Sequence, residues 1–259
     1  MMVALTGYTA VFDRSADDET PSGGTVVAGF VTTVEQWALW EDDWKAVLQK
    51  FDVPYFHMRE FCSSQKAFSS AEWKNETRRR YFVAALVATI KKWILLTVGS
   101  YMDHQIYRDA NQLCEVDKTF NPYAECGRNC VLKVRDFIRN ELGSELPISY
   151  VFDQGDQGQG MLIDLMRRCG LPDPLFKRSR RNPDHPERDR ADPPMVQLQT
   201  ADLLSWELRR WKSDYRNGQQ MRKSLKSFTD MENIIWKECT YTDIARVIHS
   251  AEIPRRRRN

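Results

Sequence analysis

The sequence predicts an α/β protein in which a mixed β-sheet is flanked by helices, with extra helices near its C-terminal end. Short apolar segments rich in Val, Tyr and Phe alternate along the chain with longer segments whose apolar residues recur at helical spacing. The first two apolar segments are joined only by the turn-rich loop 13–24, which favours an opening antiparallel hairpin. Helices between the later strands favour parallel pairing there, so the sheet is expected to be mixed.

Four strands are predicted from apolar segments enriched in β-branched and aromatic residues. In the first of them, residues also alternate in the pattern of a buried strand. They cover residues 8–13, 25–33, 94–102 and 147–153. The first and the last of these strands each end on an aspartate, at Asp13 and Asp153.

Five helices are predicted from apolar residues at helical spacing and from signals at their ends. Trp37, Trp40 and Trp44 recur on one face of the first helix, where we expect core packing, and Ser70 is the expected N-cap of the second. Gly170 closes the fourth, and two prolines precede the fifth. The helices cover residues 34–51, 71–93, 123–142, 161–170 and 196–212.

The remaining segments divide the chain into a main domain and an extension. Residues 103–120 are expected to mix helix and loop, and the polar, proline-rich segment 177–194 to form a long surface loop. We assign residues 1–212 to one domain and residues 213–259 to a peripheral C-terminal helical extension with a basic tail.

Composition predicts a soluble protein that can build a core. Of the 259 residues, 42% are hydrophobic and 29% are charged. Lys91 and Lys92 interrupt the longest apolar stretch, which is therefore expected to form a helix and a strand and not a membrane span. The first residues lack the basic region and cleavage site of a secretory signal, so we expect a cytoplasmic protein.

The six cysteines form no Cys-x-x-Cys pair. Cys126 and Cys130 lie four residues apart on one face of a predicted helix, a spacing that could supply half of a zinc site. Since no second Cys or His pair stands nearby in the sequence, scattered buried thiols in a reducing cytosol are the favoured interpretation.

Net charge is +2, but it is unevenly distributed. Basic residues outnumber acidic ones after Lys177, and acidic residues outnumber basic ones before it. The basic part contains the runs 178–181 and 255–258, which favour a polyanionic partner such as DNA or RNA. A solvated loop and a frayed tail are the alternatives.

Three aspartates stand where a carboxylate is costly. Asp13 and Asp153 end apolar strands, and Asp202 lies inside an apolar helix. If the two strands are parallel neighbours, their carboxylates lie close together, and a shared cation would relieve the repulsion. Carboxylate ligands favour Mg²⁺ or Mn²⁺ over zinc. The alternatives are turn caps for the strand-end aspartates, Asp156 as the ligand in place of Asp153, and an inward salt bridge to an arginine for Asp202.

Further polar residues could share this site. His57 and Glu60 lie three residues apart, and His57 could be a proton shuttle, a substrate contact or a buried structural histidine. Gln199 precedes Asp202 by three residues and could contact a phosphate or orient a ligand. A nucleic-acid backbone could be clamped by three arginines of the basic loop, Arg178, Arg180 and Arg181.

The order of these motifs resembles the family called domain of unknown function 3800, which is similar to the ribonuclease H-like superfamily. The resemblance rests on Asp13, the glycine pair before the second strand, the Trp-rich helix, FHMRE (56–60) and QTADLLSW (199–206), and it covers most of the chain. It implies a ribonuclease H-like fold and phosphodiester hydrolysis by a two-metal carboxylate mechanism. Asp13, Asp153 and Asp202 would then be metal ligands, with Glu60 as the fourth acid and His57 as a further catalytic residue.

The chain departs from the family pattern directly after Asp13. The family usually has Asp-Glu-Ser-Gly here, whereas this chain has Asp13, Arg14, Ser15 and Ala16. The acids at 17–19 could substitute for the missing glutamate. Two readings therefore remain: a metal-dependent nuclease, or a non-catalytic nucleic-acid- or partner-binding protein in which the guanidinium of Arg14 replaces a cation.

Overall fold

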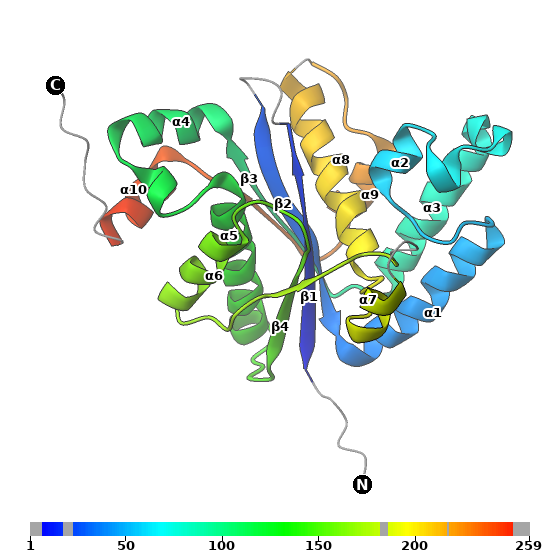
Figure 1. The fold of residues 1–259 in the computed structure, drawn as a ribbon, viewed down its shortest axis with the longest axis horizontal. Helices are drawn as coiled ribbons and strands as arrows, with labels where there is room; N and C mark the ends of the chain where they lie inside the picture. The colour runs from blue at the N-terminus through cyan, green and yellow to red at the C-terminus, as the bar shows by residue number, and fades with distance from the viewer. Residues whose placement is uncertain (1–6, 18–22, 182–185, 217, 251–259) are drawn as a thin grey trace, which may run out of the picture.

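The computed structural model describes residues 7–17, 23–181, 186–216 and 218–250. One six-stranded sheet, in the order β5-β4-β1-β2-β3-β6, runs through the molecule, and helices cover both of its faces (Figure 1). The predicted α/β class with a mixed, helix-flanked sheet is therefore confirmed. The strands are β1 (Tyr8–Ala16), β2 (Gly24–Thr33), β3 (Leu96–Asp103), β4 (Ile148–Asp153), β5 (Leu175–Lys177) and β6 (Ile234–Glu238).

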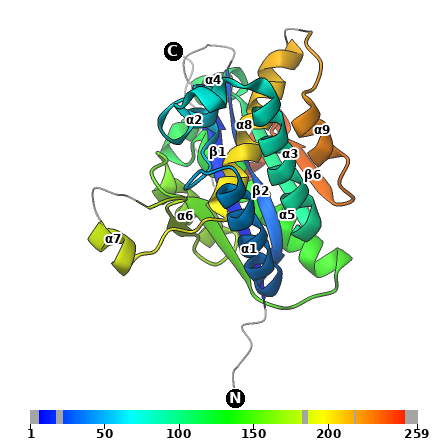
Figure 2. The ribbon, with the colours of Figure 1, turned by 90° about the vertical axis from the view of Figure 1, so that its right-hand side faces the viewer.

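The helices alternate with the strands along most of the chain, as the sequence pattern predicts. In Figure 2, the short helix α7 projects to one side of the molecule. The α-helices are α1 (Val34–Lys50), α2 (Met58–Cys62), α3 (Glu76–Trp93), α4 (His104–Leu113), α5 (Pro122–Asp136), α6 (Gln159–Arg168), α7 (Pro186–Ala191), α8 (Leu198–Arg216), α9 (Lys223–Thr229) and α10 (Tyr241–Ser250).

Strand pairing confirms the predicted hairpin and brings two of the three aspartates to one edge. β1 is antiparallel to β2, and β2 is antiparallel to β3. β4 lies parallel to β1 on its other side, with Phe12 opposite Phe152. Asp153 ends β4 as predicted, whereas β1 does not end on Asp13 but continues to Ala16, because β2 still pairs with it there. Both aspartates directly follow the Phe12–Phe152 pair, so they lie where the pairing of β1 with β4 ends.

Apolar residues are buried on both faces of the sheet, which explains why the first half of β1 and most of β2 are apolar. Phe12 and Phe152 stack 4.7 Å apart in the core beneath α5 and α6. On the other face, α1, α3 and α8 cover a core that includes the three tryptophans of α1. Trp37, Trp40 and Trp44 are all buried, as predicted.

The second predicted helix begins later than Ser70 indicates. The side chain of Asn75 accepts a hydrogen bond from the Arg78 N–H at 3.1 Å and so caps α3, which starts at Glu76. Ser70 instead precedes a single 3₁₀ turn, Ala71–Lys74. This turn buries Trp73, whose ring lies 5.1 Å from Phe82, and the packing of that indole favours the turn over a continuous helix.

The C-terminal extension differs from the helical segment that the sequence predicts. β6 pairs in parallel with β3 and extends the same sheet. Leu225 and Phe228 of α9 are fully buried, and the ring of Phe228 lies 5.6 Å from Phe30 of β2. This segment therefore belongs to the core, whereas the basic run 255–258 lies outside the described residues.

All six cysteines are free thiols. The sulfurs of Cys126 and Cys130 contact strand carbonyls, at 3.7 Å from Thr25 O and 3.3 Å from Val27 O, so both residues face the core from α5 as predicted. Four of the six are buried, and Cys62 is exposed. None of the helices in the described part of the chain is both long and apolar enough to span a bilayer.

Candidate functional site

A cavity of about 600 Å³ opens where β1 and β4 end beside α8. The three aspartates that the sequence predicts as metal ligands, Asp13, Asp153 and Asp202, all line it. Two further acids line the same cavity, Asp17 and Asp156. Its basic and imidazole side chains are Arg14, Arg59, Arg209 and His57.

Asp13 is positioned by strand alternation and by one hydrogen bond from α8. Val11 packs in the core beneath α8, and Asp13, two residues on, faces the same side of the sheet. The hydroxyl of Ser205 donates to Asp13 Oδ2 at 2.9 Å. Since α8 packs on β1 and β2, this bond fixes the carboxylate of the strand relative to the helix.

Asp153 stands at the start of a tight turn that also carries Asp156. Gly155 and Gly158 adopt left-handed conformations, with φ of 115° and 97°, which a residue with a Cβ rarely takes. The turn returns Asp156 to the cavity wall beside Asp153. Asp153 Oδ1 is buried without a hydrogen-bond partner among the described residues.

Asp202 is held by the start of α2. The residues beside it, Ala201, Leu203 and Leu204, are fully buried, so α8 cannot rotate without exposing apolar surface. The Met58 N–H donates to Asp202 Oδ2 at 2.6 Å. The alternative role considered for Asp202 was an inward salt bridge to an arginine. In the structure, the backbone N–H of Met58 is the donor to its carboxylate.

Burial raises the pKa of all three carboxyls, and neighbouring aspartates raise it further at Asp13 and Asp153. Burial raises the pKa of Asp13 well above its usual range, and the charges of Asp202, Asp153 and Asp156 raise it further. Burial, then Asp156 and Asp202, raise the pKa of Asp153 to about 7. Burial also raises the pKa of Asp202, although His57 and the Met58 N–H oppose the shift. A divalent cation would relieve this accumulation of negative charge.

The donor chemistry of the cavity fits a hard divalent cation. Its acidic side chains offer only carboxylate oxygens, the ligands that Mg²⁺ and Mn²⁺ prefer, and Asp153 Oδ1 is a buried acceptor without a donor. Within the described residues, however, no three His, Cys, Asp or Glu side chains stand together in the arrangement of a formed metal site. Metal binding therefore stays a prediction.

His57 lies at the junction between this cavity and α2. It is the N-cap of α2, and its Nδ1 accepts a long hydrogen bond from the Glu60 N–H at 3.5 Å. The ring is half-buried and lines the cavity, where its charge lowers the pKa of Asp202. His57 therefore has a structural role as the N-cap of α2, and its role as a proton shuttle or a substrate contact stays a prediction.

Glu60, the predicted fourth metal ligand, lies outside the cavity lining. It is 4% exposed and pairs with Arg180, with Lys66 Nζ at 3.1 Å and with the Tyr55 hydroxyl at 2.7 Å. Burial alone would raise its pKa, but these partners outweigh burial and lower the pKa to about 2. Because these partners already occupy both carboxylate oxygens, a cation would have to displace one of them. The metal role of Glu60 stays a prediction.

Gln199, predicted to contact nucleic acid, is instead bonded within the protein. Its Oε1 accepts from Trp44 Nε1 at 3.1 Å and from the Phe56 N–H at 2.9 Å, and its Nε2 donates to Ser179 O at 3.0 Å. The side chain is 2% exposed. Gln199 thus ties α8 to α1 and to the loops that precede α2 and α7.

The three loop arginines have different surroundings. Arg178 pairs with Asp189 at 3.0 Å and donates to Asp192 O, so it holds its own loop together. Arg180 pairs with Glu60 and lies over the ring of Tyr55 at 5.0 Å. Arg181 is exposed. Among the three, Arg181 is the most accessible to a nucleic acid.

Sequence analysis missed two cavity residues that helical spacing could have found. Trp206 and Arg209 follow Asp202 by four and seven residues, which places them on the same face of α8. Both line the cavity, and the Arg209 guanidinium lies 6.0 Å from the centre of the Trp206 ring. Arg209 also donates to Ser15 Oγ at 2.8 Å.

Arg14, which replaces the acid of the family pattern, reaches the cavity wall. Its guanidinium lies 3.7 Å from Asp156 Oδ1 and so partly balances the acidic turn after Asp153. Asp17 lines the cavity as well, whereas the other two acids proposed as substitutes, at 18 and 19, lie outside the described residues.

Comparisons with protein-family models, with curated proteins and with solved structures find no match for this chain. The resemblance to the domain of unknown function 3800 therefore stays a prediction.

Proposed function

We propose that this protein is a metal-dependent nuclease of ribonuclease H-like fold that hydrolyses phosphodiester bonds. The observation that carries the proposal is the convergence of Asp13, Asp153 and Asp202 on one cavity from β1, β4 and α8. A central β1 flanked by antiparallel β2 and parallel β4 supports the ribonuclease H-like assignment. Fold alone does not fix function, so the carboxylates carry the weight of the proposal.

The three aspartates would hold Mg²⁺ or Mn²⁺, with Asp156 as a neighbouring acid. When bound, such ions supply an activated water and stabilise the leaving oxygen. Ser205 and the Met58 N–H orient Asp13 and Asp202. Each donor bonds one carboxylate oxygen, Oδ2, and so leaves the other available to a ligand.

The remaining cavity residues suit a phosphodiester substrate. Arg209 and the exposed Arg59 can pair with phosphate oxygens, since guanidinium groups match their geometry. His57 lies beside Asp202 and can carry a proton to or from the reacting groups. No covalent intermediate with the protein is needed.

A cleavage assay tests the proposal. Protein freed of metal with EDTA is given Mn²⁺ or Mg²⁺ and incubated with labelled single-stranded DNA, duplex DNA and RNA. We expect metal-dependent cleavage of at least one substrate, and a loss of at least about 100-fold in each of Asp13→Asn, Asp153→Asn and Asp202→Asn. Circular dichroism of each variant shows whether it is folded. If the wild-type protein neither binds Mn²⁺ nor cleaves any of these substrates, the proposal fails.

A second candidate is a non-catalytic nucleic-acid- or partner-binding protein with an eroded site. The ion pair between Arg14 and Asp156 favours it, because a guanidinium can supply positive charge where a cation would otherwise bind. It predicts salt-dependent nucleic-acid binding that survives Asp153→Asn, with no Mn²⁺-dependent cleavage. Arg14→Glu, which restores the acid of the family pattern, should raise Mn²⁺ affinity if erosion is the cause.

A further inference from the structure

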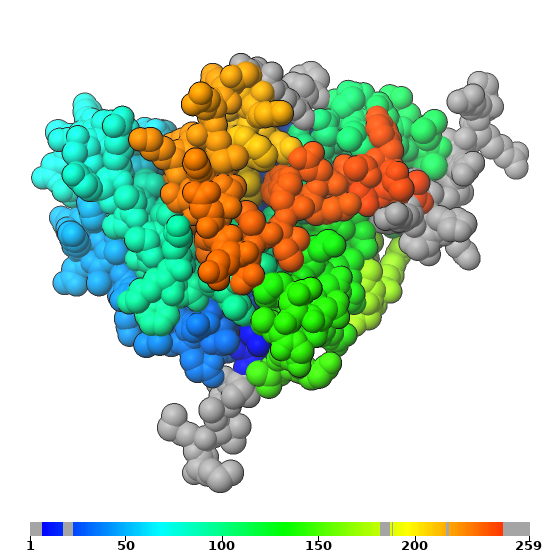
Figure 3. Space-filling model, turned by 180° about the vertical axis from the view of Figure 1, so that it is seen from behind, coloured from blue at the N-terminus to red at the C-terminus, as the bar shows by residue number. Residues whose placement is uncertain are grey.

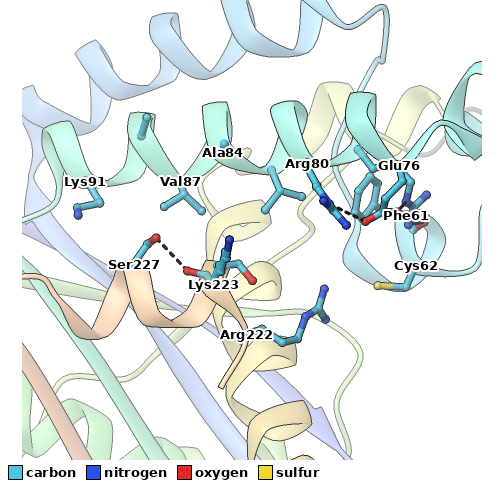
Figure 4. Close-up of a pocket in the computed structure, with 14 residues that line it drawn as sticks. Phe61, Cys62, Glu76, Arg80, Ala84, Val87, Lys91, Arg222, Lys223 and Ser227 are labelled. Atoms are coloured by element: carbon cyan, nitrogen blue, oxygen red, sulfur yellow. Dashed lines mark hydrogen bonds and ion pairs between the residues drawn. The ribbon is translucent and has the colours of Figure 1, made fainter. Parts of the chain in front are cut away.

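A second cavity, of about 790 Å³, lies between α3 and α9 on the same side of the sheet as α8 (Figure 4). We call it the α3–α9 groove. Figure 3 shows the two helices side by side on the rear face of the molecule. The floor of the groove is apolar and formed by small side chains of α3, Val83, Ala84, Val87 and Ala88. Phe61 and Cys62 lie at one end.

The lining of the groove is strongly basic. Five of its residues are arginine or lysine and one, Glu76, is acidic. Three of the five are engaged by the protein: Arg79 donates to Phe61 O at 2.8 Å, Arg80 pairs with Glu76 at 3.2 Å, and Arg222 lies 3.7 Å from Glu207 Oε2. Lys91 and Lys223 are exposed on opposite sides of the groove, and neither forms an ion pair with a described residue. Their charge is available to an anionic ligand.

The groove adjoins the acidic cavity through two stacked side chains. Arg222 lines the groove, and its guanidinium lies 5.1 Å from the ring centre of Trp206, which lines the acidic cavity. Cys62, at the end of the groove, is the last residue of α2, and the N-cap of that helix, His57, lines the acidic cavity. An extended ligand could therefore pass from the acidic cavity over Trp206 into the groove.

We infer that the α3–α9 groove binds the backbone of a single-stranded nucleic acid whose reacting phosphodiester lies in the acidic cavity, with an unpaired base replacing one of the two guanidinium groups that lie over the Trp206 ring. The inference rests on the proposed function. Arg80 and Lys91 stand about 16 Å apart along α3, at about 1.5 Å per residue, which spans several backbone phosphates. Aromatic platforms beside basic grooves are the usual means of binding single strands.

Single strands fit better than the two other polyanions. A duplex keeps its bases paired inside, so it offers no free base to Trp206. An acidic protein segment could pair with the lysines and pack on the apolar floor of the groove. It would not explain why the groove adjoins Trp206 and the carboxylates of the acidic cavity.

The test measures binding without cleavage, in EDTA and in Asp153→Asn protein. Fluorescence anisotropy follows a labelled oligo(dT) strand at several salt concentrations. The groove variant Lys91→Glu/Lys223→Glu should bind at least about tenfold more weakly, and its slope of log K against log salt should fall by about 1.4, since each phosphate contact contributes about 0.7. The matched control Lys133→Glu/Arg139→Glu changes exposed residues on the opposite face of the sheet by the same charge, and should stay within about twofold.

Cys62 gives a positional readout, because it is the only exposed cysteine in the part of the chain that the structure describes. Oligo(dT) should slow alkylation of Cys62 by iodoacetamide at least about fivefold, as followed by mass spectrometry, and a duplex of the same length should not. Equal binding by groove variant and control would overturn the inference. So would protection of Cys62 by the duplex, or by an acidic amphipathic peptide in place of oligo(dT).

The two proposals fail separately. Groove binding that persists while Mn²⁺-dependent cleavage is absent rejects the nuclease proposal alone. Cleavage that persists in the groove variant, with unchanged affinity for oligo(dT), rejects the groove alone.

Discussion

Asp13, Asp153 and Asp202 lie on the wall of one cavity, and each is held differently. Ser205 donates to Asp13, the Met58 N–H donates to Asp202, and Asp153 keeps one buried oxygen without a donor. Asp153 Oδ1 is therefore an acceptor that a cation could engage without displacing a hydrogen-bond donor. The clustered carboxylates lower the stability of the metal-free folded protein, as is common where charge is concentrated for function.

The raised pKa of Asp153 predicts a pH-dependent instability of the metal-free protein. Its carboxyl has a pKa of about 7 in the folded protein and of about 4 in the unfolded chain. Between these values the folded state binds more protons, so the free energy of unfolding falls as pH rises, and the penalty is complete only above pH 7. Asp153→Asn should thus stabilise the metal-free protein by about 1–3 kcal/mol at pH 8 and hardly at pH 4.

Urea unfolding in EDTA at the two pH values measures this difference. Saturating Mn²⁺ should reverse the order at pH 8, because it stabilises only the protein that binds it. A variant that is less stable than wild type in EDTA at pH 8 would contradict the assignment of Asp153 as a strained carboxylate.

Glu60 predicts the opposite behaviour. Its pKa of about 2 means that the ionised form is favoured in the folded protein, so its contribution is present above pH 4.5 and lost as pH falls towards 2. Glu60→Gln should cost about 1–3 kcal/mol at pH 7, since Arg180 would lose its carboxylate partner. Mn²⁺ affinity, followed by titration calorimetry, should stay within about twofold of wild type. A large loss of Mn²⁺ affinity with unchanged stability would instead make Glu60 a metal ligand.

At the scale of elements, α8 connects the two halves of the site. It packs on β1 and β2 through its leucines, bonds Asp13 through Ser205, and reaches the start of α2 through Asp202. Gln199 adds three hydrogen bonds to α1 and to the loops beside α2 and α7. The position of α2, and with it His57, therefore depends on the first two turns of α8.

Substitution of Gln199 should loosen this arrangement. Gln199→Leu removes one acceptor and one donor from a buried setting and leaves the Trp44 and Phe56 N–H groups without their partner, at a cost of about 2–4 kcal/mol in urea unfolding. Gln49→Leu, an exposed change of the same type on α1, should cost less than about 0.5 kcal/mol. Equal costs in the two variants would show that the Gln199 bonds contribute little.

Local patterns predicted most of the elements, and the predictions failed where tertiary contacts decide the structure. Ser70 and Asn75 both offer N-caps, and only the burial of Trp73 in the turn between them decides for Asn75. β6 is short, and its alignment on β3 is set by pairing across more than 130 residues. Hydrophobic periodicity carries no information on such distant partners.

The candidate site divides in the same way. The positions of Asp153 and Asp202 were predictable because strand ends and helix faces follow from periodicity, whereas β1 continues past Asp13 to Ala16. The pairing of Glu60 with Arg180 joins residues 120 positions apart. The local sequence around Glu60 does not show whether it binds a metal or an arginine. The local sequence around Arg180 does not show whether it binds a phosphate or a carboxylate.

For the whole molecule, the C-terminal segment packs into the same sheet and core as the rest of the described chain. β6 extends the sheet beyond β3, and α9 buries Leu225 and Phe228 against the core shared with α3 and α8. A chain that ends at residue 212 would expose this surface and leave β3 as an unpaired edge. We expect that truncated chain to aggregate, or to lose at least about 4 kcal/mol of stability.

Size-exclusion chromatography and urea unfolding of the truncated chain measure this outcome. A chain that ends at residue 250 keeps every described element and serves as the matched control, which should unfold at the urea midpoint of the full chain. If the chain that ends at residue 212 is monomeric and equally stable, residues 213–259 form the separate extension that the sequence predicts.

The central claim is that Asp13, Asp153 and Asp202 together bind divalent metal. A crystal soaked in Mn²⁺, with data collected for anomalous scattering from manganese, tests it most directly. We expect an anomalous peak in the cavity within about 2.5 Å of Asp153 Oδ1 and of at least one oxygen of Asp13 or Asp202, and no peak in Asp153→Asn crystals. Wild-type crystals without a peak in this cavity, or with manganese bound only at Glu60, would contradict the claim.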